Sequence, residues 1–304
     1  MKKLNMKVNI AGVELKNPVT TASGTFGSGK EYCEYVDLNR LGAIAVNAVT
    51  EKPCKGNPTP RIVETYGGIL NAVGLQNPGV EEFIRSEIPF IRAYDTKIIV
   101  NVSGRTVEEY CSIVERLSSE DVDIIELNIS CPNVKEGGVF FGTDVKMTEH
   151  VTREVKKYAK QPLMVKLTPN VTHIGEIAKA AVSGGADALS LINTIMGMAI
   201  DVHRRKPILP NIIGGFSGPA VKPVAVRMVY QVAQAVDVPI IGMGGIMSGE
   251  DAVEFILAGA TAIAVGTTNF INPRASMDVL EGIEKYLLQN KIEDVNSLIG
   301  NILV

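Results

Sequence analysis

The stretch Asp123-Ile124-Ile125-Glu126-Leu127-Asn128-Ile129-Ser130-Cys131-Pro132-Asn133 joins a predominantly apolar run to a cysteine that stands directly before a proline. Three glycines follow within residues 134–142 and give that backbone extra conformational freedom. We interpret the stretch as a buried strand, a reactive tip and a mobile loop. Free cysteines are often only small buried hydrophobic residues. However, Asn128 and Asn133 add amides that are costly to bury unpaired, which favours a site for a polar, planar ligand around Cys131.

Apolar runs of this kind recur eight times along the 304 residues. They are continuous rather than alternating, which is typical of strands buried on both faces. Between many of them lie segments with apolar residues at three- and four-residue spacing, which is typical of helices packed on one face. Repeated units of this kind in a chain of this length predict an α/β fold, a TIM (β/α)8 barrel. The predicted strands are 19–22, 43–46, 98–102, 124–129, 163–167, 188–192, 240–243 and 262–265, and the predicted helices are 107–117, 148–159, 175–183, 220–235, 249–258 and 277–288.

A doubly wound sheet is the alternative fold, but it needs a glycine-rich turn that opens a helix after the first strand. Residues 22–27 open no clear helix. Before the first strand, residues 7–15 predict an N-terminal β-hairpin that plugs the bottom of the barrel. The long connections 57–78 and 194–218 predict insertions at the C-terminal face, the first without obvious secondary structure and the second with a hairpin tip at residues 204–207. We find no linker, so we expect a single TIM-barrel domain over residues 1–304.

Composition excludes several classes of function. A hydrophobic fraction of 46% and a charged fraction of 21% fit a soluble globular protein. The net charge of -3 gives no basic field for nucleic acid, and neither a signal peptide nor a membrane-spanning run is found. The cysteines are far apart, which predicts no metal or iron–sulfur site in this chain and a reducing cytoplasm. They are Cys33, Cys54, Cys111 and Cys131.

The carboxyl ends of the predicted strands carry polar residues, and barrel enzymes place their chemistry at these ends. One asparagine there is usually a turn former, but several beside a lysine in an apolar strand indicate a lined pocket. The glycines after the last two strands offer backbone amides to a phosphate where helices are expected to begin, which predicts a phosphorylated cofactor. In chain order the ends carry Ser23, Asn47, Asn101, Asn128 with Cys131, Lys166, Asn193 with Thr194, Gly244 with Gly245, and Gly266 with Thr267.

The segment 128–133 resembles the active-site signature of the class I dihydroorotate dehydrogenases, and the resemblance covers essentially the whole chain. Residues 71–79 (Asn-Ala-Val-Gly-Leu-Gln-Asn-Pro-Gly) resemble the family's substrate loop, Ile192-Asn193-Thr194 its substrate strand, and residues 215–220 (Gly-Phe-Ser-Gly-Pro-Ala) its flavin loop. Gln76-Asn77-Pro78 and residues 217–223 resemble the class IB catalytic subunit. The main alternative to class IB is class IA, whose members are homodimers that use fumarate.

The resemblance implies FMN-dependent oxidation of dihydroorotate to orotate in pyrimidine (UMP) biosynthesis. It also implies a partner subunit that carries FAD and a 2Fe–2S cluster and passes electrons to NAD, in a heterotetramer of two catalytic and two electron-transfer chains. Cys131 is the implied base that takes a ring proton while hydride passes to FMN. The implied substrate residues are Asn47, Asn71, Ala72, Val73, Gly74, Leu75, Asn128, Asn193 and Thr194, and the implied cofactor residues are Ser23, Asn47, Ala48, Asn101, Asn128, Lys166, Ile192, Gly218, Gly244, Gly245, Gly266 and Thr267.

Asn47 departs from the family pattern, which has a lysine that touches both flavin and substrate at this position. Lys52 and Lys55 are offset along the chain, and we expect neither to reach the same point. Two alternatives therefore stay open beside the class IA enzyme. One is a related flavin barrel that acts on uracil-type rings or on tRNA uridines, although the latter needs a basic surface. The other is a catalytically impaired flavin-binding subunit.

Overall fold

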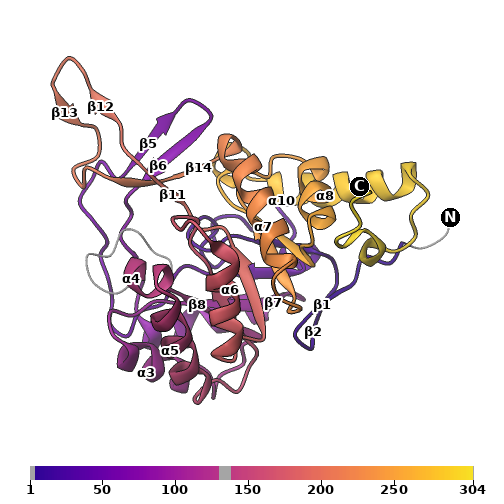
Figure 1. The fold of residues 1–304 in the computed structure, drawn as a ribbon, viewed down its shortest axis with the longest axis horizontal. Coiled ribbons are helices and arrows are strands. Elements are labelled where there is room, and N and C mark those ends of the chain that lie inside the picture. Colours follow the sequence, from indigo (N-terminus) through magenta and orange to yellow (C-terminus); the bar gives the residue numbers. More distant parts are fainter. Residues whose placement is uncertain (1–3, 130–137, 304) are drawn as a thin grey trace.

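The structure, a computed structural model, describes residues 4–129 and 138–303 and is built on a closed barrel of eight parallel strands (Figure 1). Strands that follow one another around the barrel also do so along the chain, and β16 pairs with β3 to close the ring. The predicted TIM barrel is therefore confirmed, and the doubly wound sheet is excluded. The barrel strands are β3 (Val19–Thr21), β4 (Ala43–Ala45), β7 (Lys97–Val102), β8 (Ile124–Asn128), β9 (Leu163–Lys166), β10 (Ala188–Leu191), β15 (Ile240–Met243) and β16 (Ala262–Val265).

The main helices form the outer layer and bury one face each against the barrel. Side chains in the sequence cap some of the helix ends. At the start of α3, for example, the hydroxyl of Thr106 accepts a hydrogen bond from the backbone N–H of Glu109 at 3.2 Å. All six predicted helices are present, with ends shifted by a few residues. They are α3 (Val107–Leu117), α5 (Val145–Lys156), α6 (Ile174–Ser183), α7 (Lys222–Ala233), α8 (Gly249–Leu257) and α10 (Ala275–Gln289).

Several helical segments were not predicted. The crossover from β4 to β7 is helical, with a π-helical stretch in its middle. Between β3 and β4, by contrast, only a 3-10 turn occurs. The crossover consists of α1 (Val80–Glu82), η2 (Phe83–Glu87) and α2 (Ile88–Arg92), and the remaining short helices are η1 (Leu38–Arg40), α4 (Gly138–Thr143), η3 (Pro219–Val221), α9 (Thr268–Ile271) and η4 (Val295–Leu298).

A four-stranded antiparallel sheet projects from the carboxyl ends of the barrel strands, at the upper left of Figure 1. Both predicted insertions build it, so the expectation that residues 57–78 lack secondary structure was wrong. A separate two-stranded hairpin confirms the tip predicted at 204–207. The sheet order is β11 (Ile195–Gly197), β14 (Gly214–Ser217), β6 (Gly68–Asn71) and β5 (Ile62–Thr65), and the hairpin is β12 (Ile200–Asp201) with β13 (Lys206–Pro207).

The N-terminal hairpin is also confirmed, as β1 (Val8–Ile10) pairs with β2 (Val13–Leu15) in antiparallel register. Ile10 and Leu15 are fully buried in the main core. Beside the hairpin, the backbone N–H of Asn5 donates to the carbonyl of Glu293 at 2.7 Å, which ties the two ends of the chain together. Among the described residues, no helix combines the length and apolar character needed to cross a membrane.

Candidate active site at the carboxyl ends of the barrel strands

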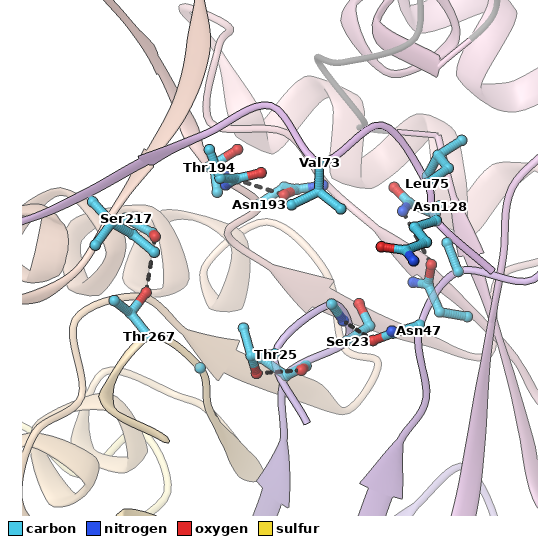
Figure 2. Close-up of a pocket in the computed structure, with 18 of the residues that line it drawn as sticks. Ser23, Thr25, Asn47, Val73, Leu75, Asn128, Asn193, Thr194, Ser217 and Thr267 are labelled. Carbon is cyan, nitrogen blue, oxygen red and sulfur yellow. Dashed lines mark hydrogen bonds between the residues drawn. The ribbon is translucent and has the colours of Figure 1, made fainter. Parts of the chain in front are cut away.

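A cavity of about 850 Å³ lies at the carboxyl ends of the barrel strands, with the four-stranded sheet as part of its wall (Figure 2). This volume is within the range of small-molecule sites. Each barrel strand, or the loop directly after it, supplies lining residues, so the predicted strand-end pocket is present. The predicted site residues on its lining are Ser23, Asn47, Ala48, Asn71, Val73, Gly74, Leu75, Asn101, Asn128, Lys166, Ile192, Asn193, Thr194, Gly244, Gly245, Gly266 and Thr267.

Three predicted site residues are not placed on this lining. Ala72 is fully buried in a small apolar cluster with Leu70 and Leu209. Gly218 follows the lining residue Ser217 but does not itself line the cavity. Cys131, the predicted base, lies outside the described residues. The structure therefore brings together the predicted binding residues and leaves the base assigned by sequence alone.

The cavity floor is a layer of buried polar side chains on neighbouring strands. The strand register sets Asn101 beside Glu126, Asn128 beside Lys166, and Lys166 beside Ser190. Glu126 and Ser190 were not predicted as site residues. The available signal was the carboxylate of Glu126 within the otherwise apolar run 124–129, since a charge is rarely buried without a partner.

Lys166 brings a positive charge to this floor and is only 4% exposed. Its Nζ donates to the hydroxyl of Ser23 at 2.9 Å and lies 3.9 Å from Oε2 of Glu126. The sequence predicted that a lysine in this apolar strand needs an anionic or acceptor partner, and the structure provides both kinds. The ammonium group is thereby held among the strand ends.

Asn47 links the loops that follow β3 and β4. Its Oδ1 accepts a hydrogen bond from the backbone N–H of Gly24 at 3.0 Å, as Figure 2 shows. Because the oxygen is engaged by the protein, the amide directs its N–H₂ group away from Gly24. Asn47 therefore has a structural role at the edge of the cavity that the sequence did not reveal.

Asn57 supports the cavity wall formed by residues 71–77 and was not predicted. Its backbone N–H donates to the carbonyl of Val73 and its side-chain amide to that of Ala72, both at 2.9 Å. Gly74, with φ of 78°, passes so close that a Cβ there would lie 2.6 Å from the Asn57 amide nitrogen. Only glycine fits where these two segments of backbone pass each other. The two hydrogen bonds from Asn57 hold the wall in place.

Of the two glycine-containing strand ends, the one after β16 matches the expectation, because α9 begins at Thr268 directly after Gly266 and Thr267, whereas the one after β15 does not. Helix α8 begins only at Gly249, and Ser248 and Asp251 already cap its first turn reciprocally. Gly244 and Gly245 precede the helix in a turn with φ of 127° and 80°. Any phosphate contact here would use the amides of this turn rather than the end of α8.

Hydroxyl groups connect the loops at this end. Thr267 donates from Oγ1 to the Ser217 hydroxyl at 2.8 Å, which joins the loop after β16 to the end of β14 (Figure 2). Elsewhere on the cavity lining, Arg61 donates to the backbone carbonyl of Lys55 at 3.3 Å and contacts the side chain of Gln76. Lys55 and Arg61 both line the cavity and bring two positively charged side chains to it.

Comparison with known proteins gives a consistent result. The family model described as dihydroorotate dehydrogenase matches residues 5–287. Three similar proteins, each named dihydroorotate dehydrogenase B (NAD(+)), catalytic subunit, come from Alkaliphilus metalliredigens, Alkaliphilus oremlandii and Lachnoclostridium phytofermentans. Their identities to this chain are 72%, 69% and 64%. The matches cover 99%, 99% and 98% of this chain and 100%, 100% and 99% of the relatives.

Proposed function

The chain belongs to the dihydroorotate dehydrogenase family, and from this membership we propose that it is the catalytic subunit of an NAD-linked, class IB dihydroorotate dehydrogenase of pyrimidine biosynthesis. The observation that carries the proposal is the convergence of four asparagines, Asn47, Asn71, Asn128 and Asn193, on one cavity. An amide both donates and accepts hydrogen bonds. A ring of amides therefore suits a dioxopyrimidine, whose edge alternates N–H donors with carbonyl acceptors.

FMN is the cofactor that we propose for this cavity, and the lining fits it. The buried ammonium group of Lys166 stands at one end. At the other end, the backbone N–H groups of Gly244 and Gly245 are paired with no acceptor among the described residues, which leaves them available to phosphate. When bound, FMN supplies the acceptor for the hydride taken from dihydroorotate. Lys166 then offers a fixed positive charge where negative charge develops.

We assign the proton transfer to Cys131 because of its place in the family signature. The thiolate accepts the ring proton, while Asn71, Asn128, Asn193 and Thr194 hold the ring and its carboxylate in position. An unperturbed thiol has a pKa of about 8.5, so activity is expected to rise with pH towards that value. Of the mobile loop expected after Cys131, residues 132–137 lie outside the described residues, and residues 138–142 belong to helix α4 rather than to a loop.

Electron transfer to NAD requires a second chain in this proposal. The curated relatives are named as catalytic subunits of NAD(+) enzymes, and this supports a partner subunit. We assign FAD and a 2Fe–2S cluster to that partner, in a heterotetramer of two chains of each kind located in the cytoplasm. The described thiols, Cys33, Cys54 and Cys111, are all free.

The test is an absorbance spectrum of the purified chain followed by anaerobic addition of dihydroorotate. We expect a flavin spectrum that bleaches with dihydroorotate and much less with dihydrouracil, which lacks the carboxylate. Equal bleaching by both compounds would favour the flavin barrel that acts on uracil-type rings. A flavin that dihydroorotate does not bleach, even with the partner subunit present, would contradict the proposed activity.

A further inference from the structure

Glu126 is a buried carboxylate in the middle of β8, with 2% of its surface exposed. Both of its oxygens are engaged. Oε1 accepts a hydrogen bond from the Ser190 hydroxyl at 2.6 Å, and Oε2 accepts one from the side-chain amide of Asn101. The Nζ of Lys166 lies 3.9 Å from Oε2. This carboxylate thus touches two residues of the cavity lining while it does not line the cavity itself.

The carboxylate dictates how the neighbouring amides are oriented. An ionised carboxylate only accepts hydrogen bonds, so Asn101 must turn its N–H₂ group towards Glu126. The Oδ1 of Asn101 then accepts from Nδ2 of Asn128 at 3.0 Å. Because its N–H₂ group is directed at Asn101, Asn128 has to turn its carbonyl oxygen the other way. One buried charge therefore fixes the orientation of two amides in sequence along the cavity floor.

The same carboxylate balances the charge of Lys166. Within the part of the chain that the structure describes, Glu126 is the only acidic residue that pairs with this ammonium group. A buried cation is costly without such a partner. The opposite charge of Glu126, 3.9 Å from the Nζ of Lys166, therefore reduces the positive potential that Lys166 exerts on the cavity.

We propose that Glu126 is a positioning residue that orients Asn101 and Asn128 for the pyrimidine ring and, through Lys166, lowers the reduction potential of the bound flavin. The inference rests on the proposed function, because it concerns residues that are expected to contact FMN and the pyrimidine. The two effects can be tested separately. The charge of Glu126 affects the reduction potential of the flavin, whereas the length of its side chain determines its contact with Asn101 and hence the orientation of the amides.

The experiment uses two variants of the flavin-loaded chain at pH 6.5. Glu126→Gln keeps the shape and removes the charge. We expect it to raise the equilibrium constant for two-electron flavin reduction about tenfold, which is about 30 mV. Glu126→Asp keeps the charge but shortens the side chain. It should leave the potential near that of the original chain and weaken orotate binding about tenfold, as read from the shift of the flavin absorption bands.

Thr20→Val is the matched control for the loss of a buried polar contact. The Thr20 hydroxyl is fully buried on a barrel strand and donates to the carbonyl of Ile263 at 2.9 Å, remote from Glu126 in the chain. This variant should change neither readout. An unchanged potential in Glu126→Gln overturns the inference, as does an orotate affinity that falls equally in Thr20→Val and Glu126→Asp.

Two further outcomes are decisive. If Glu126→Gln does not fold, an undiminished orotate affinity in Glu126→Asp still overturns the inference. If the unaltered chain binds neither flavin nor orotate, the proposed function itself fails, and this is seen before any variant is made.

Discussion

The side-chain oxygen of Asn47 lies 3.0 Å from the backbone nitrogen of Gly24 and accepts its hydrogen bond. The two residues belong to the loops after β3 and β4, so this contact closes one edge of the cavity. The resemblance of the sequence to the family implies a lysine at position 47. In this chain a neutral asparagine, bound to Gly24, stands where a lysine would bring a positive charge. The effect of this difference on the rate of catalysis can be measured.

Asn47→Lys should increase the rate of flavin reduction by dihydroorotate. A hydrogen bond to a charged group contributes about 1.5–3 kcal/mol. Made to the anionic substrate or to the reduced flavin in the transition state, it corresponds to a rate about 10- to 100-fold faster. Anaerobic stopped-flow reduction across dihydroorotate concentrations measures it, with flavin content as a check. Asn47→Met, which has neither charge nor acceptor, should be slower than the original chain, and a lysine variant as slow as the methionine variant would refute the idea.

Cys131→Ala should abolish most of the activity and retain the flavin. A general base commonly contributes about 100-fold or more to the rate, so single-turnover flavin reduction should slow by at least that factor. Cys33→Ala is the control, because that thiol donates to the carbonyl of Lys30 at 3.2 Å and does not line the cavity. If the Cys131 variant reduced its flavin at the original rate, another residue would have to be the base.

NAD reduction should depend on the partner subunit. The chain alone is expected to pass electrons from dihydroorotate to an artificial dye but not to NAD, because the proposed route to NAD runs through FAD and iron–sulfur centres on the other chain. Assays with dye and with NAD, each with and without the co-expressed partner, test this. Comparable NAD reduction by the isolated chain would argue against the class IB assignment.

Asn57→Ala should weaken substrate binding more than it slows the chemical step. The substitution removes the side-chain hydrogen bond to Ala72 and opens space beside Gly74, so the wall at residues 71–77 loses its support. We expect the dihydroorotate KM to rise about fivefold to tenfold, in line with the loss of one hydrogen bond, at nearly unchanged kcat and flavin content. Asn290→Ala, at the exposed end of α10, is the control. A kcat effect as large as the KM effect would mean that Asn57 acts on more than the wall.

Asp251 should make stability depend on pH at the acidic end. Burial raises the pKa of Asp251, but hydrogen bonds from Lys222, Met247 and Ser248 outweigh it and hold the pKa below its usual value. A carboxyl with a lowered folded-state pKa adds stability above its unfolded pKa of about 3.9, and this is lost as pH falls through the folded pKa. Asp251→Asn should therefore unfold more easily than the original chain at pH 7, and the difference should shrink below about pH 4. Urea titrations at both pH values test this, and a difference independent of pH would exclude the ionic contribution.

The barrel could be predicted because each strand is a local apolar run and each helix a local amphipathic pattern. The residues at the strand ends followed directly, since the fold itself gathers them. Three features could not be predicted, because each depends on which atoms meet across different loops or strands. They are the hydrogen bond from Gly24 to Asn47, the hydrogen bonds from Asn57 to residues 72 and 73, and the partners of the Glu126 carboxylate. The four-stranded sheet was missed for the same reason.

That sheet has a consequence for the order of folding. Its central pairing brings Asn71 of β6 to Gly215 of β14, residues 144 positions apart. The barrel strands from β3 to β10 each pair with the next barrel strand in the chain, whereas the pairing of β16 with β3 that closes the ring joins the two ends of the barrel sequence. Contacts between distant segments form slowly because a long loop must be closed first. The row of strands from β3 to β10 is therefore expected to form before the wall that carries residues 71–77, and the pairing of β16 with β3 is expected to form late. A refolding chain would pass through a stage with an open, unlined mouth, into which a large cofactor could enter before the sheet and the closed ring enclose it.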